Sequence, residues 1–257
     1  MERNSLRVKL ERRETVVGTM ITTFAEPDCA RVMAEARLDY TFIDSEHTPF
    51  GMETIASLCD AARRFGLPPI VRVPNTEYHL MARRLDAGAL GLMIPRVESA
   101  GQVERIVQSV YYPPVGVRGC APRAVMMDYE SVALPEFLQW SNENIVIVIQ
   151  IESQEGLDRL DEILSVEGTH VALIGPTDMS VSLGVPGDMK SPKLWAAIEQ
   201  VVAACERHGQ AAGIHAGATE MTVECAKRGM RFLTCTSDGG LLARGARDML
   251  ASIRNAL

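Results

Sequence analysis

Two acidic residues stand at the ends of two apolar runs, and their spacing points to a shared site. The first run is Ile145–Ile149, which is followed by Gln150 and Glu152; the second is Val171–Ile174, which leads to Asp178. Apolar runs rich in β-branched residues are typical of strands that a parallel sheet buries on both faces. Side chains alternate along a strand, so the glutamine and the glutamate point to the same side. Both acids therefore fall at the same end of adjacent strands, where burial is costly unless a cation or a donor meets them.

Glu152 and Asp178 offer only oxygen ligands. Two carboxylates suit a divalent cation such as Mg²⁺ or Mn²⁺, and Co²⁺ also fits, with water and substrate completing the shell. The alternative is that each acid forms a salt bridge or caps a helix, and capping is a strong rival for Asp178, which opens a predicted helix. The backbone amides of Thr177 and Asp178 could bind a carboxylate or phosphate at that helix start, or belong to an ordinary tight turn.

An arginine and a histidine follow two other predicted strands. Arg72 lies inside an apolar strand, where a guanidinium needs an anion. That anion is either a substrate carboxylate or oxyanion, or an internal partner, Asp44 or Glu152. His47 lies in the loop after the predicted strand 40–44 and beside acids, so it is the candidate general base, although a lone loop histidine is often incidental.

The same strand ends supply further polar residues, namely Asp44, Glu46, Arg96 and His215. His215 has three open roles: it lines the pocket, acts as a third metal ligand, or packs. No G-x-S-x-G motif or P-loop occurs, and no lysine lies on a predicted strand, which disfavours a Schiff-base mechanism.

The elements that must position these residues alternate along the whole chain. Strands are predicted at 15–22, 40–44, 69–73, 90–94, 145–152, 171–174, 211–215 and 232–236, with a helix after each. Eight such repeats predict one (β/α)8 TIM barrel over residues 1–257, whose active site lies at the C-terminal ends of the strands. A doubly wound open sheet is the second choice, weakened by the absence of G-x-G-x-x-G after the first strand. The long connection at 111–131 is expected to be functional.

Composition limits the kinds of partner. The 257 residues carry a net charge of −7, so no basic face for nucleic acid is expected. The six cysteines are scattered without a C-x-x-C pair, which indicates free thiols in a reducing compartment. No apolar run is long enough for a membrane span or a signal peptide, so we expect a cytoplasmic protein without membrane contact.

Seven segments together resemble one known family. They are Ile43–His47, Val71–Pro74, Arg84–Gly88, Tyr112–Gly119, Gln150–Glu152, Gly175–Ser180 and Leu241–Arg244. In order and over nearly the whole chain, they resemble the class II, metal-dependent pyruvate aldolases of the HpcH/HpaI family. That family includes 4-hydroxy-2-oxoheptanedioate, 2-dehydro-3-deoxyglucarate and 2-keto-3-deoxy-L-rhamnonate aldolases, which act in aromatic or sugar acid catabolism.

The resemblance implies a TIM barrel of the pyruvate-binding type and a particular assembly. The last helix would be exchanged between subunits, and the subunits would form a homo-hexamer, a trimer of dimers. Asp86 matches the acid that raises the basicity of the catalytic His47. We expect Asp86 at a helix end on the bottom of its own barrel, so it could reach that histidine only from a neighbouring subunit.

The resemblance also implies a role for each rim residue. Glu152 and Asp178 would bind the divalent metal. Gln150 and the backbone at Thr177 and Asp178 would bind the 2-oxo acid, and Arg72 would bind it and stabilise the enolate. The expected reaction is reversible cleavage of a 4-hydroxy-2-oxo acid to pyruvate and an aldehyde.

Two other classes of function stay open. One is a lyase of the same superfamily, an oxaloacetate decarboxylase or a CoA-ester lyase, and the other is a barrel that binds metal or oxo acid without turnover. The chain departs from the family pattern at Ser45, Thr177, His215 and the loop Cys120–Met127. Because these positions surround the aldehyde half of the pocket, they leave the acceptor undefined.

Overall fold

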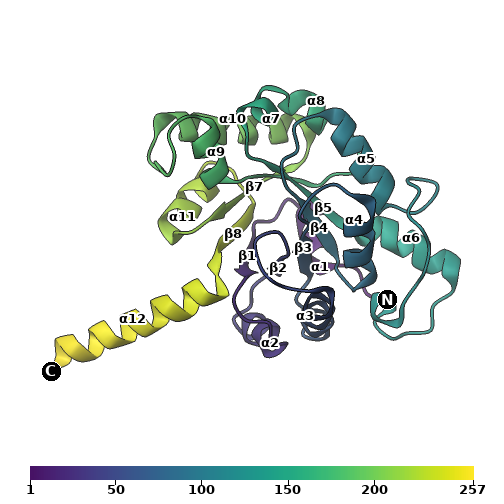
Figure 1. The fold of residues 1–257 in the computed structure, drawn as a ribbon, viewed down its shortest axis with the longest axis horizontal. Coiled ribbons are helices and arrows are strands. Elements are labelled where there is room, and N and C mark those ends of the chain that lie inside the picture. Colours follow the sequence, from purple (N-terminus) through teal and green to yellow (C-terminus); the bar gives the residue numbers. More distant parts are fainter.

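The computed structural model describes residues 1–257 as a closed barrel of parallel strands in the order β1 to β8 (Figure 1). The strands are β1 Val16–Ile21, β2 Tyr40–Asp44, β3 Pro69–Arg72, β4 Gly91–Ile94, β5 Val146–Ile151, β6 Val171–Ile174, β7 Ala211–Ala216 and β8 Phe232–Ser237. Strand β1 pairs with both β2 and β8, so the sheet has no edge. The predicted TIM barrel is confirmed, and the open sheet is excluded.

Helices connect the strands. They are α1 Ser5–Glu11, α2 Asp28–Glu35, α3 Met52–Arg64, α4 Tyr78–Asp86, α5 Ala100–Val110, α6 Leu134–Asn144, α7 Gln154–Asp158, α8 Leu160–Leu164, α9 Pro176–Ser182, α10 Pro192–His208, α11 Thr219–Lys227 and α12 Asp238–Ala256. The helix expected after the fifth strand is divided in two, because Arg159, with φ −110°, leaves the helical region and separates α7 from α8. The long connection at 111–131 contains a short 3₁₀ helix, Ala124–Met127.

Alternation along the strands creates two cores. Residues of one parity, such as Tyr40, Phe42 and Ile70, fill the barrel together with Val146 and Val148. Residues of the other parity pack between the strands and the surrounding helices in a larger core. Because the strands are buried on both faces, they are apolar at nearly every position, which is the pattern of a parallel sheet.

The alternate positions whose side chains point into the barrel continue to the C-terminal ends of the strands. We call these ends the rim. Two residues beyond Phe42 comes Asp44, and two residues beyond Ile70 comes Arg72. Gln150 follows Val148 in the same way, and His215 has the same parity as Ala211 at the start of β7. The side chains that fill the barrel thus change from apolar to polar at the rim.

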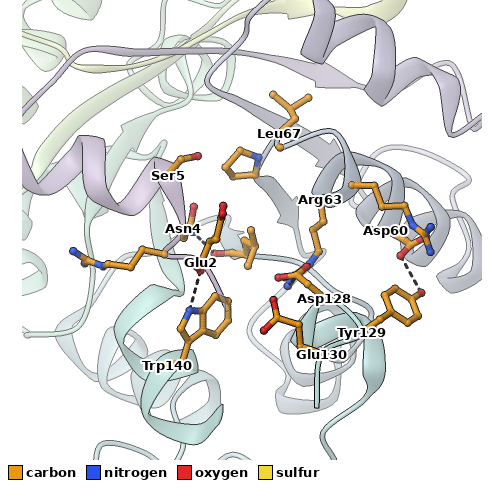
Figure 2. A pocket seen from close by; sticks show the side chains of 15 residues that line it. Glu2, Asn4, Ser5, Asp60, Arg63, Leu67, Asp128, Tyr129, Glu130 and Trp140 are labelled. Atoms are coloured by element: carbon orange, nitrogen blue, oxygen red, sulfur yellow. Dashed lines mark hydrogen bonds and ion pairs between the residues drawn. The ribbon is translucent and has the colours of Figure 1, made fainter. Parts of the chain in front are cut away.

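Helix α1 lies at the opposite, N-terminal end of the barrel. Its Leu6 is fully buried in the interior core, and the side chain of Asn4 accepts a hydrogen bond from the Leu6 amide at 3.1 Å as the helix N-cap. A cavity of about 450 Å³ opens beside this helix (Figure 2). Its charges pair with one another: Arg63 with Asp128 at 2.7 Å, and Arg64 with Asp60 at 2.9 Å. The first pair joins α3 to the long connection, and the second lies within α3. Arg3, which also lines the cavity, pairs with Glu11 at 2.9 Å.

Helix α12 extends away from the barrel (Figure 1). Several of its apolar side chains are exposed, among them Leu242, Met249, Leu250 and Ile253. No helix in the structure is both long and apolar enough to cross a membrane.

Candidate active site

Arg72 and Asp44 form a buried ion pair at the rim. They face each other in the register of β2 and β3, and Arg72 Nε and Nη2 donate to the two Asp44 oxygens at 2.8 and 2.9 Å. Burial alone would raise the pKa of Asp44, but the hydrogen bonds and positive charge of Arg72 outweigh it and lower that pKa. Of the two internal partners considered for Arg72, Asp44 is the one observed. Arg72 Nη1 makes no hydrogen bond within the chain.

Glu46 continues this row of charges towards the surface. Its carboxylate lies 3.3 Å from Arg72 Nε, 2.7 Å from Arg96 Nη2 and 3.6 Å from His47 Nε2. The Glu46 side chain is only 6% exposed, whereas those of His47 and Arg96 are 60% and 66% exposed. A buried carboxylate is thus held between two arginines, immediately beside the candidate base.

Glu152 and Gln150 form the next part of the rim. The Arg96 amide donates to Glu152 Oε1 at 2.9 Å, and Gln150 Nε2 donates to Glu152 Oε2. A Cβ on Gly175 would lie 2.6 Å from Gln150 Nε2 and 2.8 Å from Glu152 Oε2, so only glycine lets these side chains lie against the end of β6. Gln150 Oε1 is buried without a hydrogen-bond partner, which leaves one acceptor free for a ligand.

The carboxyl of Glu152 is in an environment that favours a cation. Burial and then the negative charge of Asp178 raise its pKa to about 7, although the Arg96 amide acts in the opposite direction. A carboxyl whose ionisation is disfavoured by burial and by a neighbouring acid is stabilised in its ionised form by a divalent cation. No group of three or more His, Cys, Asp or Glu residues is arranged to hold a metal. The chain therefore offers two carboxylates, and His215 does not join them as a third ligand.

Helix α9 begins earlier than expected, and this changes the position of Asp178 in the helix. Gly175 is the N-cap and Pro176 the first helical residue, so Asp178 lies in the first turn and makes no capping hydrogen bond. The capping alternative for Asp178 is therefore wrong. The amides of Thr177 and Asp178 donate to no backbone carbonyl, as expected for the first turn of a helix.

Comparison with known proteins identifies the family. The profile described as HpcH/HpaI aldolase/citrate lyase matches residues 20–245. The chain belongs to this family. It is 35% identical to a hydroxypyruvate/pyruvate aldolase from Deinococcus radiodurans over 90% of this chain and 83% of that protein.

Solved structures of the family share its barrel. The crystal structure of an HpcH/HpaI aldolase from Desulfitobacterium hafniense is 33% identical, with a TM-score of 0.91 over 97% of this chain and 96% of that one. A citrate lyase β-subunit from M. tuberculosis, complexed with oxaloacetate and magnesium, shares only the fold, at 16% identity and a TM-score of 0.58 over 92% and 95% of the two chains. Aldolase is the lyase activity that these relatives support.

The structure separates Asp86 from the other expected site residues of this aldolase. Asp86 ends α4, and its Oδ1 accepts a 2.7 Å hydrogen bond from Arg118 Nη2, whose side chain is buried. Asp86 also lines an external groove of about 680 Å³, together with Met52 and Arg123. Within one chain, Asp86 therefore interacts with the long connection and not with His47.

His215 lies inside the rim. Its ring meets Phe42 edge-on, with centroids 5.9 Å apart. Burial and then the charge of Arg72 lower its pKa to about 4, so the imidazole is neutral at physiological pH. Of its open roles, packing is observed, and lining the pocket is compatible with that position.

Two rim residues had no predicted role. Glu46 and Arg96 were visible only as polar residues after strands, yet they join Arg72, His47 and Glu152 into one network. The available signal was an acid directly before the candidate base. The partner of that acid comes from another strand end, and sequence spacing does not reveal it.

Proposed function

We propose that this family member is a metal-dependent aldolase that cleaves a 4-hydroxy-2-oxo acid reversibly to pyruvate and an aldehyde. The observation that carries the proposal is Glu152, a carboxyl with its pKa raised to about 7 beside Asp178 and at the same rim as Arg72 and His47. This arrangement combines a cation site, a fixed positive charge and a candidate base, as cleavage of a carbon–carbon bond next to a ketone requires.

Glu152 and Asp178 would hold the metal, with Mg²⁺, Mn²⁺ and Co²⁺ as the candidates for two oxygen ligands. A bound divalent cation would act as a Lewis acid on the ketone and carboxylate of the 2-oxo acid. Gln150 Oε1, the free acceptor at the rim, and the amides of Thr177 and Asp178 would orient the substrate. The metal-binding barrel without turnover is disfavoured because a candidate base and a positive charge accompany the two acids.

The chain's own groups would then handle charge and protons. His47 would remove the proton of the 4-hydroxyl, and cleavage of the C3–C4 bond would leave negative charge on the enolate oxygen. Arg72, held rigidly by Asp44, would stabilise that charge through its free Nη1. Because Arg72 is already fixed by its partner, little reorganisation is needed when the charge develops.

We further propose that the active site is completed by a second copy of the chain. The His47 side chain is 60% exposed in a single subunit, and Asp86 lines a groove on the outside of its own barrel. Placing the His47 loop of one subunit in that groove of another would unite the two groups. A homo-hexamer built as a trimer of dimers, with α12 exchanged between subunits, would supply this arrangement, and the cytoplasm would be its compartment.

The test is pyruvate release from a panel of 4-hydroxy-2-oxo acids, before and after EDTA and with each metal restored. Hydroxypyruvate is included as an alternative donor in the synthesis direction. Glu152→Ala and Asp178→Ala should each lose metal binding, measured by calorimetry, and turnover, by roughly a thousandfold or more. Glu155→Ala, an exposed acid on α7, is the matched control and should retain both.

Two kinds of result would contradict the proposed metal-dependent aldolase. A Glu152 or Asp178 variant that turns over without bound metal would exclude the proposed mechanism. Release of CO₂ from oxaloacetate, or cleavage of a CoA ester, without activity on any hydroxy-oxo acid would instead favour the other lyases of the superfamily.

A further inference from the structure

Arg118, in the long connection, holds Asp86 by only one of its two carboxylate oxygens. Arg118 Nη2 donates to Asp86 Oδ1 at 2.7 Å, and Asp86 Oδ2 accepts no hydrogen bond within the chain. The Arg118 side chain is 1% exposed, whereas that of Asp86 is 27% exposed and borders the external groove. The pair therefore joins a buried cation to a partly exposed acid that keeps one acceptor free.

The surroundings of Arg118 fix it in place. Its guanidinium carbon lies 4.6 Å from the centre of the Tyr112 ring, a cation–π contact with a fully buried side chain. The next amide in the connection, that of Gly119, donates to the Tyr78 hydroxyl at 2.8 Å. Tyr78 and Asp86 are the first and last residues of α4. Two successive residues of the connection thus contact both ends of this helix.

Packing alone does not account for an arginine at this position. Nε and Nη1 of Arg118 are buried without a hydrogen-bond partner. Such unpaired donors cost free energy, and an apolar side chain of similar length would avoid that cost. The contribution that an apolar side chain could not make is the charge-assisted hydrogen bond to Asp86.

A hydrogen bond to one oxygen also determines how the other oxygen is presented. A carboxylate at a helix end can rotate about its side-chain bonds, and a bond to a fixed donor removes much of this freedom. In the proposed assembly, the His47 loop of another subunit enters the groove that Asp86 borders. An imidazole that arrives there would meet an acid that is already oriented.

We infer that Arg118 is a positioning residue, which orients Asp86 so that its free Oδ2 accepts the imidazole N–H of His47 from a neighbouring subunit. The inference rests on the proposed aldolase function and on its shared site. Arg118 lies outside the rim and contacts neither the substrate nor the metal ligands. It acts only through Asp86, and therefore only on the step that His47 performs.

The test measures two reactions in the wild type and in Arg118→Met. The kcat for cleavage of a 4-hydroxy-2-oxo acid should fall by about 10- to 100-fold, because a base works more slowly when its acid is misplaced. KM and the exchange of pyruvate methyl protons with deuterium should each change by less than about threefold, because the residues that bind pyruvate are retained. A merely structural loss would reduce both reactions together.

A double variant separates an effect through Asp86 from an independent one. Asp86→Asn should slow cleavage by itself, and adding Arg118→Met should cost less than about threefold more, because the acid is already absent. Losses that multiply in the double variant would overturn the inference. Arg118→Lys keeps the charge without the planar fork and should retain more cleavage activity than Arg118→Met.

Arg63→Met is the matched control. Arg63 is also nearly buried and also binds the long connection, through Asp128 at 2.7 Å and the Met126 carbonyl at 3.2 Å, but it does not contact Asp86. Its loss should leave the ratio of cleavage to exchange at the wild-type value. Equal ratios in Arg63→Met and Arg118→Met would mean that Arg118 only stabilises the connection, and this would refute its positioning role.

Failure of this inference can be told from failure of the proposed function. A wild type that releases no pyruvate from any hydroxy-oxo acid would refute the proposed function, and the role of Arg118 with it. A wild type that does release pyruvate, with an unchanged kcat in Arg118→Met, would refute only the role of Arg118. Circular dichroism and light scattering check that the variant is folded and assembled. If it is not, the same ratio of cleavage to exchange is measured in Arg118→Lys, and a wild-type ratio and kcat there would count against the inference.

Discussion

At the scale of single residues, the rim is a row of alternating charges that runs from the barrel interior to solvent. Asp44 is buried, Arg72 lies beside it, and Glu46 connects Arg72 to the exposed Arg96. Each charge is compensated by the next, which is how a barrel interior tolerates ionised groups. The exception is Glu152, whose nearest strong influence is another acid, Asp178. Among these groups, this pair is the one that gains most from a cation.

His47→Ala should separate proton removal from enolate formation. Without the base, cleavage of the C3–C4 bond should fall by about 10²- to 10⁴-fold, because the 4-hydroxyl proton has no acceptor. Exchange of the pyruvate methyl protons with solvent deuterium should fall less, since Arg72, Glu152 and Asp178 are retained. Both rates are measured by NMR, with the exposed His79→Ala as control. Parallel losses of both reactions would remove His47 from its assigned step.

Residue types and alternation were enough to predict part of this site. Gln150 and Glu152 were expected on one side of a strand, and they do lie together. The need of Arg72 for an anion was also correct, and the anion in the chain is Asp44. The contacts of Glu46 and Arg96 depend on the exact height at which β2 and β4 end. Sequence patterns define strand ends only to within a few residues, so such contacts stay out of reach.

At the scale of elements, the two ends of the barrel differ in the residues they carry. The C-terminal ends of the strands carry the polar rim, whereas the N-terminal end is closed by α1 and by short loops. His170 belongs to the second group: it precedes β6, and its Nδ1 accepts a hydrogen bond from the Ile147 amide at 2.9 Å. Only the neutral imidazole has this acceptor. Burial and then the charge of Arg7 lower the pKa of His170 to about 3.

This environment predicts a pH-dependent stability. The unfolded histidine has a pKa of about 6.5. Below that pH the histidine is protonated in the unfolded chain but stays neutral in the folded chain. The contribution of His170 is complete above pH 6.5 and falls by about 1.4 kcal/mol per pH unit towards pH 3. His170→Asn keeps an acceptor for the Ile147 amide but cannot titrate. Its free energy of unfolding should therefore decline by about 2 kcal/mol less between pH 7 and pH 5 than that of the wild type.

Urea titrations at pH 5, 6 and 7 measure this difference as a slope, so a general loss of stability in the variant does not affect the result. His215, whose pKa is lowered to about 4, adds the same decline to both proteins and cancels. Identical pH slopes in wild type and His170→Asn would show that His170 is not held neutral in the fold.

At the scale of the whole molecule, the single chain has two incomplete features. One is the exposed base His47, with its expected acid Asp86 engaged by Arg118 away from the rim. The other is α12, which leaves the barrel with Leu242, Met249 and Ile253 exposed. Their spacing of seven and four residues places them along one helical face, as in helices that pack against a partner. The family resemblance predicted helix exchange, and nothing within one chain covers this face.

Charges placed on this face should break the proposed assembly. The double variant Met249→Asp, Ile253→Asp puts two carboxylates where a neighbour would pack, so light scattering should show a smaller species than the hexamer expected for the wild type. Ala251→Asp adds a carboxylate on the opposite side of α12 and should leave the assembly intact.

Activity should follow the assembly, because Asp86 of one subunit would serve His47 of another. Turnover of the double variant should fall by about tenfold or more and should recover partly as protein concentration rises. Unchanged turnover in a dissociated variant would mean that each barrel holds a complete site, and Asp86 would then have no part in catalysis. A monomeric wild type with full activity would reject both the exchange of α12 and the shared site. The two incomplete features therefore lead to one prediction. If α12 joins the subunits, it also brings Asp86 of one subunit to His47 of another, so loss of the α12 contacts should impair the base.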